Sequence, residues 1–309
     1  MRVSVLGVGS IGSVVAASLA ITSSDVHLHV RGERGARQML EGLRVEGHQE
    51  LEFGPDRFLF SCEELPFDAE LNGASDLVIL ACKSYAVPHL AQQAMTFLKP
   101  NGIVFALSNG LGHVETLSRT LGPKRVLAAS TTHGAFSHIG QDPRWAGYGA
   151  ISLATSSLGP SSNRVQEVAD LLNQARLNAV VEPDATALVW DKVMLNVAIN
   201  PLAALGGLKN GELLEPELFA ACMMVYREAS AVAMMERIKV QNERMFEQRL
   251  RAVLEQTRDN TCSMLQDVKA GRQTEIGALN QAIVERAEHH GLAAPINQML
   301  SALIRACHP

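Results

Sequence analysis

The sequence predicts an α/β protein in which an N-terminal Rossmann-type, doubly wound sheet is followed by an all-α C-terminal domain. Short apolar runs alternate with helical patterns through the first half, and a GxGxxG segment follows the first of these runs. After Gly207 the apolar positions recur at helical spacing to the end of the chain. Because 309 residues suffice for two cores, we expect domains at residues 1–183 and 184–309.

Composition excludes several classes of function. The chain is 47% hydrophobic and 19% charged with a net charge of -5, which offers no basic surface for nucleic acid. No 18-residue uncharged apolar run indicates a membrane span. The cysteines are odd in number and form no CxxC pair, which favours a reducing cytoplasmic compartment and neither a disulfide framework nor a metal site: Cys62, Cys82, Cys222, Cys262 and Cys307.

The first element is an apolar strand at Val3–Leu6 that leads into a glycine-rich turn and a helix over 13–20. At such a strand-to-helix turn the glycines let the backbone approach a pyrophosphate, and the helix N-terminus faces its charge. The alternative is a merely tight turn. The predicted cofactor-binding residues of this turn are Gly7, Val8, Gly9, Ser10, Ile11 and Gly12.

The residue that follows the second strand, Val26–Val30, bears on the choice of cofactor. An acidic residue there would bind the ribose 2′-hydroxyl of NAD, whereas a basic residue accommodates the 2′-phosphate of NADP. The chain has Arg31 at this position, with Arg34 as a second basic residue and Glu33 as an opposing charge. We therefore expect NADPH, although a solvated loop arginine is the alternative.

Further apolar runs complete the predicted sheet. The segment 43–60 alternates and contains glycines and a proline, so it suggests a small antiparallel insertion. Strands are expected at 77–81, 103–107, 126–129, 151–154 and 179–181, with helices at 86–97 and 164–175. Small polar residues follow three of these strands, around Lys83, Asn109 and His133. Ligands bind beyond the carboxyl ends of parallel strands, although each stretch alone is more typical of a turn.

A long apolar helix is predicted from Asp184 to Gly207, with Asp184 as its N-cap, a kink at Pro201 and a stop at the final glycines. Lys192, Asn196 and Asn200 are spaced four residues apart and share one face. Because the flanking residues are apolar nearly all round, the lysine is expected to be half-buried and partnered, which makes it a candidate proton donor. An ordinary wet helix face is the alternative.

The helical half contains one dense polar patch, over residues 260–267 and 271–276. Helices are expected within 216–237, 243–257, 274–290 and 296–306. Thr274 could cap the third of these, which would make Glu275 a first-turn carboxylate favoured by the helix dipole. That explanation does not account for the polar residues before it.

Taken together, these residues resemble the ketopantoate reductase (2-dehydropantoate 2-reductase) family, over nearly the whole chain. The resemblance rests on GVGSIG, Arg31, Lys83, Asn109-Gly110, His133-Gly134-Ala135, Trp190-x-Lys192-x-x-x-Asn196-x-x-x-Asn200-Pro201-Leu202, Asn210-Gly211-Glu212-Leu213, Ser263-Met264-Leu265-Gln266-Asp267 and Gly271-Arg272-x-Thr274-Glu275-Ile276.

The resemblance implies an enzyme that reduces a small 2-keto acid with NADPH in a site where the two domains meet. It implies that Lys192 is the general acid and that Glu275 binds the substrate hydroxyl and organises the lysine. It also implies that Lys83 lies near the cofactor and that substrate or cofactor is bound by Asn109, Asn196, Asn200, Asn260 and Ser263. The partner is thus a small molecule, and the sequence leaves open a monomer or a homodimer.

Three positions depart from the family pattern and leave the substrate open. Gly277 stands where aspartate is usual, Gln281 where glycine is usual, and Ser108 where glutamine is common. Ketopantoate is the expected substrate, and a different small keto acid is the alternative. A third hypothesis, a non-catalytic NADPH-binding sensor, predicts loss of Lys192 or Glu275, yet both are present.

Overall fold

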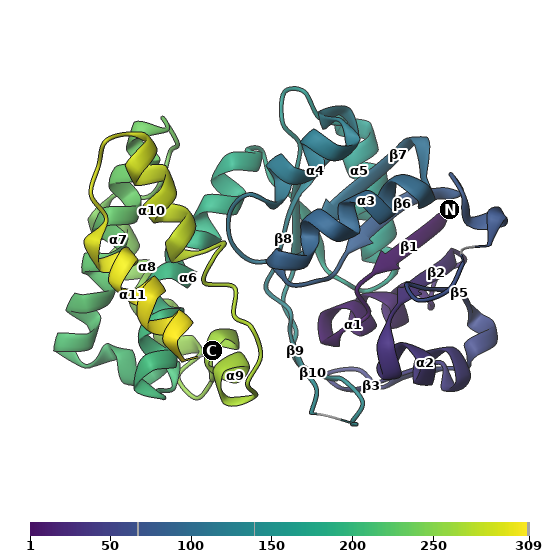
Figure 1. Cartoon of the computed structure of the whole chain (residues 1–309), viewed down its shortest axis with the longest axis horizontal. Coiled ribbons are helices and arrows are strands. Elements are labelled where there is room, and N and C mark those ends of the chain that lie inside the picture. The colour runs from purple at the N-terminus through teal and green to yellow at the C-terminus, as the bar shows by residue number, and fades with distance from the viewer. Residues whose placement is uncertain (67, 139, 308–309) are drawn as a thin grey trace. The chain divides into compact units, whose positions relative to one another are not determined.

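The computed structural model describes residues 1–66, 68–138 and 140–307. The chain divides into two compact units, shown with their elements in Figure 1. One comprises residues 1–108 and 113–188, and the other comprises residues 109–112 and 189–309. The division at residue 183 expected from the sequence did not anticipate that residues 109–112 belong with the helices.

The α/β unit is built on a five-stranded parallel sheet with the strand order of a Rossmann fold. Its strands, from one edge to the other, are β5 (Phe58–Cys62), β2 (Asp25–Val30), β1 (Arg2–Leu6), β6 (Ser75–Leu80) and β7 (Leu98–Ala106). Its helices are α1 (Ser10–Leu19), α2 (Gly32–Glu41), α3 (Val87–Phe97), α4 (His113–Leu121) and α5 (Ser162–Gln174). The predicted Rossmann-type sheet is confirmed.

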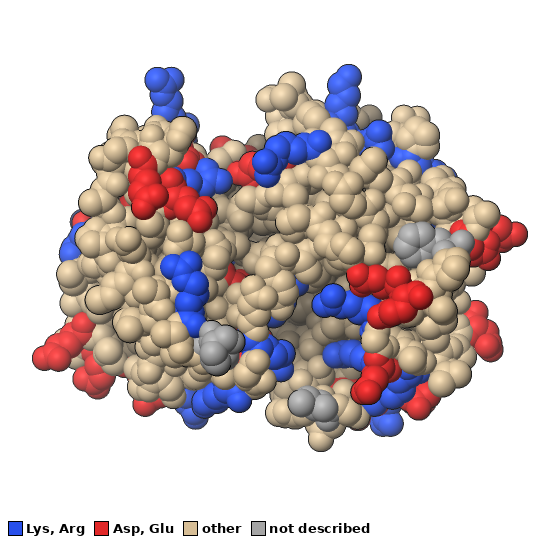
Figure 2. All heavy atoms as spheres, viewed as in Figure 1, with Lys and Arg blue, Asp and Glu red and all other residues tan. Residues whose placement is uncertain are grey.

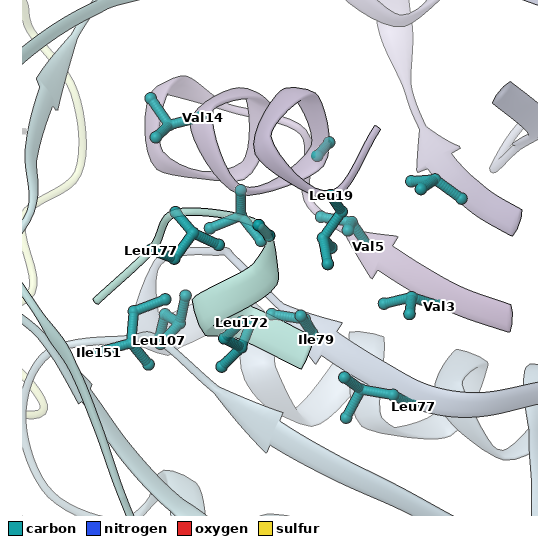
Figure 3. Packing of buried hydrophobic residues seen from close by; sticks show 14 of the residues in the cluster. Val3, Val5, Val14, Leu19, Leu77, Ile79, Leu107, Ile151, Leu172 and Leu177 are labelled. Atoms are coloured by element: carbon teal, nitrogen blue, oxygen red, sulfur yellow. The ribbon is translucent and has the colours of Figure 1, made fainter. Parts of the chain in front are cut away.

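Both faces of this sheet are buried, as its continuous apolar strands require. Along β6, Leu77 and Ile79 point to one face and pack in a cluster with residues of α1 and α5, as Figure 3 shows. Val78 and Leu80 point to the opposite face and pack against α3 and α4. The alternation of side chains along each strand therefore supplies two cores.

Two smaller sheets correct the prediction of a single, mainly parallel sheet. The first part of the segment 43–60 does form an antiparallel pair, but its last strand, β5, joins β2 in the parallel sheet. The late strands form a separate mixed sheet because β11 pairs antiparallel with β8. The strands are β4 (Leu51–Phe53), β3 (Leu43–Gly47), β10 (Arg144–Gly147) and β9 (Gly134–Phe136) in one sheet, and β12 (Ala179–Val181), β11 (Ile151–Ala154) and β8 (Ala128–Thr131) in the other.

Two histidines of β2 are buried in a hydrogen-bonded row across the parallel sheet. The Ser4 hydroxyl lies 2.7 Å from His27 Nδ1, and the Ser61 hydroxyl lies 2.8 Å from both His27 Nε2 and His29 Nδ1. The Phe97 ring packs against both imidazoles. Burial lowers the pKa of His27 to about 3 and also lowers the pKa of His29, so both rings are neutral near pH 7.

This row predicts acid sensitivity of the α/β unit. The pKa of His27 is lower in the folded chain than its ordinary value of 6.5, so the unfolded chain binds the additional proton and stability falls as the pH drops from about 6.5 towards 3. We expect a loss of about 2 kcal/mol between pH 7.5 and pH 5 from His27 alone. Denaturant unfolding at the two pH values should show a smaller difference for His27→Gln than for the native chain. Replacement of the exposed His89 by glutamine is the matched control, and an undiminished difference in His27→Gln would contradict the assignment.

The second unit is all-helical, as predicted. Its elements are α6 (Ala185–Gly206), whose first turn belongs to the α/β unit, then α7 (Pro216–Met235), α8 (Glu243–Gln256), α9 (Ser263–Lys269), α10 (Asn280–His289) and α11 (Pro295–Ala306). Their apolar faces share one core, within which the Tyr226 and Phe246 rings stack at 3.8 Å. Both α6 and α7 are long and apolar enough to cross a membrane by length and composition alone, a test that buried core helices also pass.

The structure excludes the capping explanation for Glu275. The helix expected within residues 274–290 begins at Asn280, and residues 275–279 before it form successive turns. Their backbone bonds run from the Ala278 amide to the Glu275 carbonyl and from the Leu279 amide to the Ile276 carbonyl. Glu275 is therefore held in a turn and is not a first-turn helix residue, which removes the helix-dipole explanation for it.

Candidate active site and cofactor loop

The helix α6 presents the three polar residues that its sequence placed on one face. Its start is confirmed, since the Asp184 carboxylate accepts hydrogen bonds from the amides of Thr186 and Ala187 at 2.8 and 3.0 Å. Lys192 and Asn196 are partly buried and Asn200 is 6% exposed. The local sequence thus supplies a rigid support for an ammonium group and two amides.

Lys192 carries the most informative charge in the helical unit. Burial lowers its pKa from 10.5 to about 8, and the charge of Glu275 acts in the opposite direction. Glu275 is only 5% exposed, so the attraction is little screened by solvent. A lysine whose pKa lies near neutral pH can both hold and release a proton under ordinary conditions.

Asn109 reaches Glu275 from a segment 166 residues earlier in the chain. Its Nδ2 donates a hydrogen bond of 2.8 Å to Oε2 of the carboxylate. The neighbouring backbone is docked as well, because the Leu111 amide donates to the Ala278 carbonyl at 2.7 Å. Gly110 has a φ of +93°, and a Cβ there would lie 2.3 Å from that carbonyl oxygen, so the close approach requires glycine.

The other two residues expected to bind substrate lie in the segment before and at the start of α9. Asn260 and Ser263 are exposed, and their predicted role stays a prediction. The segment is tied to α6 through Cys262, whose thiol donates to the Asn200 carbonyl at 3.6 Å. The helical unit therefore holds Lys192, Glu275 and Asn109 as one group, with Asn200 and Ser263 joined to it through this link.

The glycine-rich turn connects β1 to α1 in the α/β unit, as the sequence predicted. Gly7 has a φ of +88°, and a Cβ on Gly12 would lie 2.2 Å from the Gly7 carbonyl, so both positions need glycine. A Cβ on Gly9 would meet nothing within 4 Å, which leaves open space above the turn. Such a turn fits the pyrophosphate of a dinucleotide.

Arg31 lies at the end of β2 and is exposed. An acidic residue that sequence reasoning missed lies beside it: the Glu64 carboxylate accepts a 3.0 Å hydrogen bond from the Gly32 amide. Hydrogen bonds from the Cys62 thiol and from Gly32 hold the pKa of Glu64 below its usual value. Figure 2 shows positive and negative side chains interspersed over the part of the unit that contains α2 and β5. Glu64 belongs to no motif or periodic pattern in the sequence. It follows the edge strand β5, and because the parallel pairing of β5 with β2 was not predicted, Glu64 was not expected to lie beside Arg31.

Two further side chains brace the glycine-rich turn. Arg34 donates a 3.1 Å hydrogen bond to the Ser137 hydroxyl, which lies 3.0 Å from the Ser10 hydroxyl. Gln38 donates to the Val8 carbonyl at 3.2 Å. Burial and the charge of Arg37 lower the pKa of Arg34. Arg34 thus supports the turn from α2, whereas Arg31 remains exposed to solvent.

The remaining polar strand ends have different surroundings. Lys83 follows β6 and is partly buried in the α/β unit. His133 is structural: its Nδ1 accepts from the Gly149 amide, and its Nε2 lies 3.0 Å from the Leu177 carbonyl. Across residues 1–66, 68–138 and 140–307, no three His, Cys, Asp or Glu side chains are grouped so as to hold a metal ion.

Known proteins resemble this chain over its whole length. Residues 3–157 match the model described as ketopantoate reductase PanE/ApbA, and residues 184–308 match its C-terminal model. A 2-dehydropantoate 2-reductase of Pyrococcus horikoshii is 32% identical over 99% of this chain and 97% of its own, and one of Archaeoglobus fulgidus is 31% identical over 98% and 97%.

Solved structures share the fold. A PanE/ApbA family ketopantoate reductase from Ralstonia eutropha superimposes with a TM-score of 0.86 at 26% identity, over 99% of this chain and 98% of its own. A D-mandelate dehydrogenase solved with NADH and anilino(oxo)acetate reaches a TM-score of 0.88 at 22% identity, over 99% and 98%, which shows likeness of fold alone.

Proposed function

This chain belongs to the ketopantoate reductase family, and we propose that it reduces 2-dehydropantoate to pantoate with NADPH. The observation that carries the proposal is the group formed by Lys192, Glu275 and Asn109. The proposed division of labour is the one expected from the sequence, in which residues 1–183 bind the cofactor and residues 184–309 supply the proton donor and hold the substrate. Asn109 is the exception, because it contacts Glu275 and belongs with the helical unit.

The residues of this group divide the reaction among them. Bound NADPH supplies the hydride that the carbonyl carbon accepts. As negative charge builds on the carbonyl oxygen, the Lys192 ammonium stabilises it and donates a proton to it, which yields the alcohol. Glu275 favours the charged form of Lys192 and accepts a hydrogen bond from a substrate hydroxyl. Asn109 holds Glu275 Oε2 in place through the 2.8 Å bond.

The amides of Asn196 and Asn200, with Asn260 and Ser263, offer hydrogen bonds to the substrate carboxylate. Neutral donors suit this task because they bind an anion without adding net charge beside Lys192. A positively charged side chain in their place would lower the pKa of Lys192 further. The composition of the group therefore favours a small acidic ketone over a neutral one.

The glycine-rich turn and the basic side chains of the α/β unit support a nicotinamide dinucleotide. Gly9 leaves open space for the pyrophosphate, and Gly7 and Gly12 allow the tight turn that Val8, Ser10 and Ile11 complete. Lys83 follows β6 in the same unit. Arg31 is the proposed contact of the 2′-phosphate. D-mandelate dehydrogenase, which shares the fold, was solved with NADH in two structures, so a direct comparison of NADPH with NADH tests the proposed preference.

Replacing Arg31 with alanine tests the cofactor preference. We expect KM for NADPH to rise about tenfold, since a charge-assisted contact to the 2′-phosphate is lost, while KM for NADH stays nearly constant. Initial rates measured over a range of NADPH and NADH concentrations give the two KM values and their ratio. Replacement of the exposed Arg119 of α4 by alanine is the matched control. An equal change in both KM values would assign Arg31 to the fold and not to the phosphate.

The decisive assay follows the loss of reduced-nicotinamide absorbance with ketopantoate and either NADPH or NADH. Turnover with NADPH well above that with NADH is the expected result. NADPH binding without turnover of ketopantoate would overturn the substrate assignment and leave the cofactor assignment in place.

A second candidate substrate is a different small keto acid, and one observation favours it. A Cβ on Gly277, two residues after Glu275, would meet nothing within 4 Å, so the family's usual aspartate is replaced by open space. A panel of 2-keto and β-keto acids of graded size separates the candidates by kcat/KM. If ketopantoate is among the poorest substrates, the keto acid with the highest kcat/KM replaces it as the proposed substrate.

A cytoplasmic, reducing location is part of the proposal and is supported by the five free cysteines. The proposed partner is the small-molecule substrate, and neither nucleic acid nor a membrane is included. The proposed chemistry uses residues of one chain.

A further inference from the structure

The helix that carries Lys192 has an internal proline, which leaves one backbone carbonyl of the helix without its usual hydrogen-bond donor. Pro201 lies inside α6 and has no N–H, so the carbonyl of Val197, four residues earlier, loses its ordinary helical donor. Val197 is completely buried, so water cannot easily replace the donor. An unpaired buried carbonyl destabilises the folded chain.

Asn280, the first residue of α10, supplies the missing donor. Its Nδ2 lies 3.1 Å from the Val197 carbonyl oxygen and 2.9 Å from Asn297 Oδ1, so both amide protons are used. Asn280 is fully buried. Its Oδ1 makes no hydrogen bond within the part of the chain that the structure describes, so the side chain acts here as a donor.

The orientation of the two amides follows from the groups at the ends of the chain of hydrogen bonds. Asn297 Nδ2 lies 2.8 Å from Glu228 Oε2 and 3.4 Å from the Val225 carbonyl, and both of these groups only accept. Asn297 must therefore turn its Oδ1 towards Asn280, and Asn280 must turn its Nδ2 towards Val197. The Glu228 carboxylate is held in place by the amides of Ile296 and Asn297 at the start of α11.

Asn280 also ends the turn that carries Glu275. The turn 275–280 is joined to residues 109–112 by the Leu111 amide and by the Asn109 side chain. At its other end it is joined to α6 by the bond from Asn280 to Val197. Three segments far apart in sequence thus meet at one turn, and the bond from Asn280 connects the turn to the lysine helix.

We propose that Asn280 is a positioning residue, which replaces the hydrogen bond that Pro201 removes and thereby sets the placement of Lys192 and Asn200 relative to Glu275. Asn280 contacts neither substrate nor cofactor in this role and acts through the Val197 carbonyl. The activity part of the inference rests on the proposed function, whereas the coupling between Asn280 and Pro201 does not.

A double-mutant cycle between Asn280→Ala and Pro201→Ala tests the inference. Alanine at 201 restores an N–H that can bond to Val197, so Asn280 should matter less in that background. We expect Asn280→Ala to lower kcat about tenfold and to lower Tm in the native background, and to change kcat by less than about threefold in the Pro201→Ala background. If Asn280→Ala does not fold, Asn280→Ser, which keeps one hydroxyl donor, goes through the same cycle.

Asn210→Ala is the matched control, because it removes a buried asparagine whose Nδ2 donates to the Thr257 hydroxyl at 2.9 Å and not to Val197. Its losses should be the same in both backgrounds. If Asn280→Ala lowers Tm and kcat by the same amounts in the native and the Pro201→Ala backgrounds, the inference is overturned.

The pH profile of kcat separates positioning from simple stabilisation. If Asn280 sets the distance between Glu275 and Lys192, its removal weakens their attraction and moves the alkaline fall of kcat to lower pH. An unmoved alkaline limb would restrict Asn280 to stability and overturn its positioning role. If the native enzyme fails to turn over ketopantoate, the Tm cycle still reports on the Asn280–Pro201 coupling, so that failure is distinguishable.

Discussion

Replacing Lys192 with alanine is expected to lower kcat by about three orders of magnitude, because one group supplies both the proton and the stabilisation of charge on the carbonyl oxygen. NADPH affinity should remain nearly constant, since the glycine-rich turn and Arg31 belong to the other compact unit. Steady-state rates and the quenching or enhancement of NADPH fluorescence measure the two quantities.

The pH dependence of the native enzyme adds a second signature. Lys192 donates a proton only in its charged form, and its pKa is lowered from 10.5 to about 8 by burial. The rate of reduction should therefore fall as the pH rises above about 8, and this limb should be absent from the residual activity of Lys192→Ala. Replacement of the exposed Lys239 by alanine is the control for loss of one positive charge. Strong residual turnover in Lys192→Ala would remove the lysine from the role of general acid.

The same variant separates the enzyme from the non-catalytic sensor. A sensor would bind NADPH with or without Lys192 and would show no turnover in the native chain. If the protein is an enzyme, the native chain shows turnover and the Lys192→Ala variant does not. The native rate with ketopantoate and with the keto-acid panel is therefore the reference against which Lys192→Ala is read.

Glu275→Gln is the variant with the second largest expected effect, a fall of about two orders of magnitude in kcat. The neutral amide no longer opposes the loss of the proton from Lys192, so the pKa of the lysine should drop below about 8 and the alkaline limb should move to lower pH. A pH–rate profile measured beside that of the native enzyme detects both changes.

Two controls make the Glu275 result specific. Glu288→Gln removes an exposed carboxylate of α10 and should leave the profile in place. Asn109→Leu keeps the charge of Glu275 but removes the donor to its Oε2, so it should weaken substrate binding more than it moves the limb. A reduced kcat for Glu275→Gln with an unmoved limb would contradict the electrostatic part of the role and leave substrate binding as its function.

Local patterns in the sequence were sufficient for much of the α/β unit. The apolar run at residues 3–6 and the glycines that follow it determine a strand, a tight turn and a helix from their own chemistry, and the structure has β1 and α1 there. The failures nearby have local causes. The segment of α2 contains Gly32 and Gly35 and has few apolar residues, and its helix was not predicted. The strand β5 was taken as part of an insertion because its parallel partner β2 lies about 30 residues earlier.

In the helical unit, the sequence by itself determined α6, its N-cap at Asp184 and the common face of Lys192, Asn196 and Asn200, because helix periodicity relates residues only a few positions apart. Only the tertiary structure decided that Asn109 meets Glu275, that residues 275–279 form turns, and that Asn280 donates to the carbonyl released by Pro201. The contacts of Asn109 and Asn280 join segments about 80 to 170 residues apart, and their energies depend on burial and on unpaired partners that no local pattern contains.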